Sequence, residues 1–125
     1  MRALIARDLS DARVTGVSAD RRFATAYNAA LLATSMAIAC AGYRVTAKIG
    51  HHRVSFDSLS LAVGARAAKY ADYFETCRRK RNMIDYTRSR VATETEAKEI
   101  VGKADELYEF VEAWIGTNFS AFKRK

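Results

Sequence analysis

The chain has 125 residues, of which 21 are lysine or arginine and 14 are aspartate or glutamate, so its formal net charge is +7. This length suits a single domain, residues 1–125, and is too short for two typical domains. Half of the residues are apolar, which excludes a largely disordered chain. The positive charge favours an anionic partner such as nucleic acid and excludes nothing about the fold.

The cysteines and the apolar stretches predict a cytoplasmic protein. Cys40 and Cys77 lie far apart without metal-ligand spacing, which favours two reduced thiols over a disulfide. Near the N-terminus, Asp8 and Asp11 interrupt the apolar stretch that a signal peptide needs. The longest apolar run, residues 29–42, is about 14 residues long, whereas a membrane span needs about 20. We therefore expect a buried helix there and no membrane association.

The first half of the chain predicts two helices of unequal length. Proline is absent and there are only six glycines, which favours an all-α fold, here an up-and-down bundle of four to five helices. Residues 1–17 contain a short N-terminal helix with Gly16 at its end. Ser18 is placed to cap a second, long, alanine-rich helix, which Gly42 closes.

Residues 43–53 predict a loop, because they combine β-branched residues with Gly50 and two histidines, although a brief strand pair over 43–49 is an open alternative. Residues 54–63 then carry apolar side chains at helical spacing and end at Gly64.

Two further helices complete the expected bundle. The first starts at about Ala65 and runs into the basic stretch 77–86. Thr93 and Glu96 form a capping box at the start of the last, amphipathic helix. Residues 120–125 form a basic tail, and we expect its last three residues, "KRK", to fray.

The stretch "CRRKRNMIDY", residues 77–86, is the main candidate for a binding site. At 100° per residue, one arc of the helix collects Arg78, Arg81, Asn82 and Asp85, with Arg79 and Tyr86 at its edges. Arg88 follows, and residues 78–90 contain six basic side chains and one acid. Guanidinium groups at this spacing bind phosphate oxygens bidentately, and Asn82 is suited to a phosphate oxygen or a ribose hydroxyl. The side chains expected to bind nucleic acid are Arg78, Arg79, Arg81, Asn82, Asp85 and Arg88.

Two non-binding explanations of this stretch stay open. The basic residues form a solvated face in which Arg81 and Asp85 pair at i,i+4 spacing, worth a few tenths of a kcal/mol. Alternatively, the last helix neutralises them, since seven of the 14 acids lie between residues 94 and 112. The helix would then serve a non-enzymatic dimeric interaction module as a structural or partner interface.

Several segments together resemble a HEPN domain, the higher eukaryotes and prokaryotes nucleotide-binding family. These are "AYNAALLATSMAIACAGYR", "GHHR", "RRKRNMIDY" and the acidic closing stretch "ETEAKEIVGKADELYEFVEAWI", which lie in family order over residues 21–115. The chain is most similar to small stand-alone bacterial members of toxin–antitoxin and defence loci.

The resemblance implies a helical bundle that forms a homodimer and acts on RNA or a nucleotide without a metal or other cofactor. It also implies an antitoxin-like protein as a possible partner. The active members carry an arginine, often followed by a polar residue, and a histidine four to six residues after the arginine. Arg81 and Asn82 match the first half of this signature, but Tyr86 stands where the histidine is expected. The candidate catalytic residues are therefore Arg81, Asn82 and Tyr86.

The missing histidine predicts ribonuclease activity that is weak or lost. Attack of a 2′-hydroxyl on its phosphate needs a proton acceptor that works near neutral pH, as imidazole does at about 6.5. The pKa values of tyrosine, about 10, and aspartate, about 3.9, lie on either side of that range. RNA binding without efficient cleavage is the expected outcome.

The remaining candidates favour structural roles. His51 and His52 are adjacent and have no third ligand near them in sequence, so we expect no metal site. Cys77 precedes four basic residues, but its place on the apolar stripe predicts a buried thiol rather than a reactive one. Trp114 is expected in the core or at a dimer contact.

Overall fold

The computed structural model describes residues 1–42, 51–84 and 90–124, with only the helical backbone for 51–55. Within these ranges the chain forms five α-helices, two 3-10 turns and no strand, which confirms the predicted all-α class. The elements are α1 (Arg2–Asp11), α2 (Ala19–Cys40), α3 (His51–Val63), η1 (Ala65–Ala67), α4 (Ala68–Ile84), α5 (Glu94–Asn118) and η2 (Ser120–Phe122). The strand pair considered for residues 43–49 lies outside the described residues.

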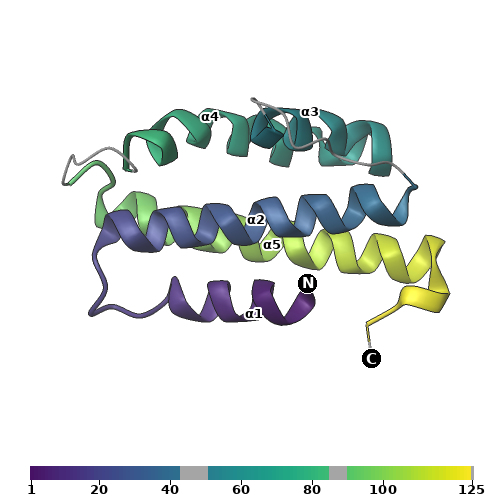
Figure 1. Cartoon of the computed structure of the whole chain (residues 1–125), viewed down its shortest axis with the longest axis horizontal. Coiled ribbons are helices and arrows are strands. Elements are labelled where there is room, and N and C mark those ends of the chain that lie inside the picture. The colour runs from purple at the N-terminus through teal and green to yellow at the C-terminus, as the bar shows by residue number, and fades with distance from the viewer. Residues whose placement is uncertain (43–50, 85–89, 125) are drawn as a thin grey trace.

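The central helix of the bundle is α2, which contacts each of the other four α-helices. Figure 1 shows α3 and α4 on one side of the α2 and α5 pair and α1 on the other side. Small buried side chains on α2 allow its neighbours to approach closely, and these are Ala26, Ala29, Ala30, Ala33 and Ala37. Phe56 of α3 joins three helices, because its ring lies 5.5 Å from that of Tyr27 on α2 and 5.4 Å from that of Phe74 on α4.

The predicted helix ends are confirmed where local chemistry determines them. The Ser18 hydroxyl accepts the backbone N–H of Arg21 at 3.2 Å and caps α2. Thr93 and Glu96 form the reciprocal capping box of α5, with bonds of 2.9 and 3.0 Å. Gly42 and Gly64 have φ values of 88° and 100°, a conformation that glycine adopts without a steric cost.

Two expectations about connecting segments were wrong. Residues 51–53, assigned to a loop, form the first turn of α3 instead, because the helix begins immediately after Gly50. The basic tail is held rather than frayed up to Arg124, whose guanidinium donates two hydrogen bonds to Glu109 at 2.7 and 3.1 Å. The Arg124–Glu109 contact spans 15 positions, so local propensity does not determine it.

In the described part of the chain, α2 is the one helix that is long and apolar enough to cross a bilayer. Its 22 residues exceed the apolar run of about 14 residues that the sequence suggested. More than half of its most apolar window, 56%, is buried inside the bundle, as in other core helices.

Candidate nucleic-acid interface

The basic residues of α4 do not share one solvent-facing arc. Arg81 lies two turns beyond the fully buried Phe74, on the side of α4 that faces the core, and is half-buried. Arg78 is also half-buried, whereas Arg79 and Asn82 are exposed. The arc that collects Arg78, Arg81 and Asn82 is therefore only partly exposed, because its Arg81 edge lies on the core-facing side of α4.

Arg81 contacts α2 through two neighbouring residues. Its Nη2 donates to Oδ1 of Asn28 at 3.4 Å, and its guanidinium carbon lies 5.9 Å from the centre of the Tyr27 ring. The second contact has cation–π geometry. Burial and, secondarily, the Glu75 carboxylate raise the pKa of Tyr27 well above its ordinary value, so its hydroxyl stays protonated at neutral pH. Arg81 is thus held against α2 by an amide and an aromatic face.

Sequence reasoning did not identify Asn28 or Tyr27 as site residues. Tyr27 is a buried core residue of α2. A usable signal existed for Asn28, since asparagine within an alanine-rich helix lowers helix propensity and usually has a bonding reason.

Arg78 bonds to an acid on its own helix. Its Nε donates to Oε1 of Glu75 at 2.8 Å, one turn earlier on α4. The other carboxylate oxygen of Glu75 is buried and has no hydrogen-bond partner among the described residues. A buried acceptor without a donor is unfavourable, so this carboxylate is only partly satisfied by the protein.

The acids of α5 do not neutralise the arginines of α4 within the described residues. Lys80 is the basic residue of α4 that pairs with α5, through a 2.8 Å contact with Glu96. Glu99 accepts the Tyr73 hydroxyl at 3.1 Å. The other paired acids of α5 bind arginines from α1, α2, the segment after α1 and the tail: Glu94 with Arg22, Asp105 with Arg13, Glu109 with Arg124 and Glu112 with Arg2. The neutralised-helix explanation therefore holds for Lys80 and not for Arg78 or Arg81.

The second half of the sequence motif lies outside the described residues. This applies to Asp85, Tyr86 and Arg88, whose assigned roles stay predictions. The side chains of His51 and His52 are likewise not described, although both residues begin α3.

Cys77 and Trp114 are packing residues. Cys77 is a buried free thiol, and burial raises its pKa to about 11, which confirms the structural role rather than the reactive one. Trp114 is half-buried and packs edge-to-face on Phe119 at 5.3 Å between ring centres. In the part of the chain that the structure describes, no three metal-ligating side chains gather into a site.

Comparison with known families agrees with this arrangement of helices. The model of the SAV_6107-like HEPN family matches residues 14–112, which is well over half of the chain and includes α2, α3, α4 and most of α5. No curated protein and no solved structure gives a significant match.

Proposed function

From the premise that this chain belongs to the SAV_6107-like HEPN family, we propose that it binds RNA through the basic end of α4. Family membership supports a nucleotide- or RNA-related role, and the choice of RNA and of this surface is our proposal. Arg78, Arg79 and Arg81 supply the phosphate contacts, and Asn82 bonds to a phosphate oxygen or a ribose hydroxyl.

The observation that carries the proposal is that the acids of α5 do not pair with the arginines at this end of α4 within the described residues. Arg78 pairs with Glu75 on its own helix, and Arg79 is exposed. A protein that needed these side chains only for stability would pair them with the acids of α5, as it does for Lys80. The remaining positive charge attracts a polyanion.

The contact of Arg81 with α2 preorganises its guanidinium for binding a phosphate. Asn28 and the Tyr27 ring restrict the guanidinium before any ligand arrives, so less side-chain entropy is lost on binding. The phosphate would meet an arginine that already has a defined direction, next to the exposed amide of Asn82.

Catalysis by this site would be weak. The position where the family signature expects a histidine holds Tyr86, so no imidazole in the motif accepts the proton of a 2′-hydroxyl. Arg78 and Arg81 can still stabilise the charge that develops on the phosphate. Any ribonuclease activity should persist in EDTA and disappear in Arg81→Ala, whereas loss in EDTA alone would assign the activity to a contaminating metal enzyme.

The proposal includes a homodimer in which two copies of α4 face each other across the two-fold axis and form one composite basic groove. It also includes the role of a toxin or defence effector that an antitoxin-like protein neutralises. Light scattering coupled to gel filtration tests the dimer, and growth arrest on expression, relieved by the product of a neighbouring gene, tests the biological role.

The binding experiment uses the full chain, a dye-labelled single-stranded decanucleotide RNA and fluorescence anisotropy at about 50 mM salt. The Arg78→Ala/Arg81→Ala double variant should bind at least about tenfold more weakly, because each change removes a charge-assisted hydrogen bond. Arg79→Ala, at an exposed position, should weaken binding by about threefold without affecting the fold.

Lys98→Ala on α5 is the matched control, because it also removes one exposed positive charge, away from α4. It should lower affinity by less than about twofold. Thermal unfolding of every variant separates loss of binding from loss of fold. Absence of RNA binding by the parent protein at low salt, or equal binding by the double variant, would overturn the proposal and favour a protein-interaction role.

A further inference from the structure

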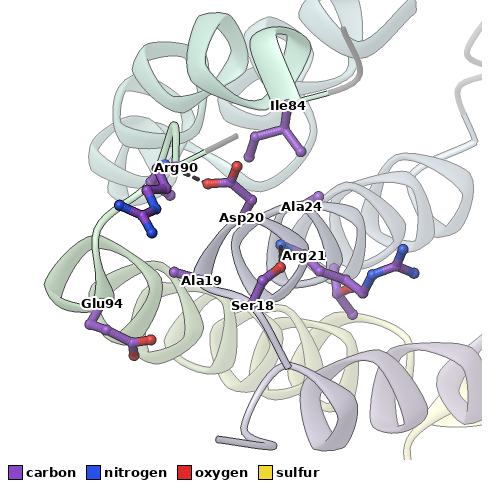
Figure 2. A pocket seen from close by; sticks show the side chains of 10 residues that line it. Ser18, Ala19, Asp20, Arg21, Ala24, Ile84, Arg90 and Glu94 are labelled. Atoms are coloured by element: carbon purple, nitrogen blue, oxygen red, sulfur yellow. Dashed lines mark hydrogen bonds between the residues drawn. The ribbon is translucent and has the colours of Figure 1, made fainter. Parts of the chain in front are cut away.

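A pocket of about 730 Å³ lies at the end of the bundle where α2 begins. Figure 2 shows it between the first turns of α2, the end of α4 and the segment that leads into α5. Its lining combines small and hydroxyl-bearing residues with four charged ones: Ser18, Ala19, Asp20, Arg21, Ala24, Thr25, Ile84, Arg90, Ala92 and Glu94. Of the binding residues predicted from the sequence, none that the structure describes lines this pocket.

The two acids in the lining are already engaged. The Asp20 carboxylate accepts the backbone N–H groups of Val91 and Ala92, at 3.1 and 2.6 Å, and thereby joins α2 to the segment before α5. The Glu94 carboxylate pairs with Arg22, whose side chain is only 3% exposed. Neither carboxylate is therefore available to compensate another positive charge in the pocket.

The two lining arginines are exposed and have no acidic partner among the described residues. Figure 2 shows Arg90 and Arg21 on either side of Asp20 and Ala24, with the Arg21 side chain extending away from Asp20. Arg90 has a φ of 58°, a left-handed conformation that costs a non-glycine residue about 1 kcal/mol. The bonds from Asp20 to the next two N–H groups hold the backbone in this conformation.

The pocket adjoins the proposed RNA surface on both helices. Ile84 lies three residues beyond Arg81 on α4, and Thr25 lies three residues before Asn28, the partner of Arg81, on α2. Three residues of an α-helix correspond to a rise of about 4.5 Å. The pocket is therefore less than one helical turn from Arg81 along α4 and from Asn28 along α2.

We propose that this pocket is a second RNA subsite that takes one nucleotide unit within a chain, with one flanking phosphate at Arg90 and the other at Arg21. Two guanidinium groups on either side of Asp20 and Ala24 fit a unit that has a phosphate on each side, as every internal nucleotide has. The small side chains in the lining leave room for the ribose and base. This inference rests on the proposed function. It adds that an RNA must reach a minimum length to contact both the end of α4 and this pocket.

The test compares a trinucleotide with a decanucleotide, both single-stranded and dye-labelled, on the full chain at about 50 mM salt. The variant is Arg21→Ala/Arg90→Gly. Glycine adopts a φ of 58° without strain, and alanine suits the first turn of α2, so both substitutions preserve the fold. The matched control is Arg66→Ala, which removes an exposed arginine before the opposite end of α4.

The double variant should bind the decanucleotide about tenfold more weakly than the parent and the trinucleotide with less than about twofold change. The slope of log K against log salt for the decanucleotide should decrease by about 1.4, because two phosphate contacts of about 0.7 each are lost. Unchanged binding of the decanucleotide, or an equal loss for both lengths, would overturn the second subsite. Loss of binding in Arg78→Ala/Arg81→Ala would still support the proposed function in either case, so the two failures are distinguishable.

Discussion

The arginines near the chain termini and those at the end of α4, two places that lie far apart in the bundle (Figure 1), have different partners. Near the chain termini, Arg2 and Arg124 each donate two hydrogen bonds to an acid of α5, Glu112 and Glu109 respectively. At the end of α4, the one ion pair of Arg78 lies within its own helix, and Arg81 bonds to the neutral amide of Asn28. Within the described residues, the arginines near the termini pair with acids of α5, and those at the end of α4 do not.

The pair at the termini has the geometry of a structural contact. Arg2 Nε and Nη2 lie 2.7 and 2.8 Å from the two oxygens of Glu112, whose side chain is 3% exposed. Burial by itself raises the pKa of Glu112, but the hydrogen bonds from Arg2 and Tyr108 outweigh it and hold the pKa below its ordinary value. The pairing of each charge therefore identifies a structural arginine, which net charge by itself does not.

The largest expected effect is on stability at the termini. Arg2→Ala leaves the buried Glu112 carboxylate without its main partner, and we expect the free energy of unfolding to fall by about 2 kcal/mol. Urea denaturation measures this change. Arg7→Ala, on the same helix, removes an arginine whose side chain is 63% exposed and should cost less than about 0.5 kcal/mol. Equal losses would mean that the Arg2 pair has no special role.

The contribution of the Arg2–Glu112 pair to the free energy of unfolding should depend on pH. The folded-state pKa of Glu112 lies below its ordinary value of 4.5, so the stabilisation is complete above that value and is lost as pH falls through the folded pKa. The difference in unfolding free energy between the parent protein and Arg2→Ala should stay constant from neutral pH to about 5 and shrink below about 4.5. A difference that grows on acidification would contradict the lowered pKa.

The two cysteines lie beside the two groups of arginines and should differ in reactivity. Cys77 directly precedes the basic residues of α4, and Cys40 lies near Arg2. With a pKa of about 11, roughly one Cys77 thiol in a thousand is ionised at pH 8. Cys40 is half-buried, so we expect iodoacetamide to alkylate it at least about tenfold faster than Cys77. Mass spectrometry of the peptides measures both rates, and faster labelling of Cys77 would show that the basic run outweighs burial.

The smallest expected effect concerns Glu75, the acid that occupies Arg78. Glu75→Gln removes this competing charge and should raise affinity for the RNA decanucleotide by about fivefold at low salt, as expected for about 1 kcal/mol of interaction. Glu106→Gln makes the same charge change on an exposed part of α5 and should leave affinity within about twofold. Weaker binding in Glu75→Gln would mean that Glu75 orients Arg78 for the ligand instead of competing with it.

The sequence-based predictions were correct for contacts between residues close together in the sequence and missed contacts between residues far apart. The caps at Ser18 and Thr93 were predictable because each bonds to a backbone N–H three residues away. The contact of Arg81 with Asn28 spans 53 residues of sequence, and that of Arg124 with Glu109 spans 15. Helical periodicity identifies the face on which a side chain lies but not which neighbouring helix meets it.

Composition, periodicity and capping residues were sufficient to predict an all-α bundle and its main helix ends, and the resemblance of several segments to known sequences indicated the HEPN family. The packing of the helices decided which arginines find acids, because α2 and α5 bring together residues that are far apart in the chain. It also placed Arg81 against Tyr27 and Asn28 and formed the pocket lined by Arg21 and Arg90. Charge is a property of the sequence, but compensation of charge is a property of the fold.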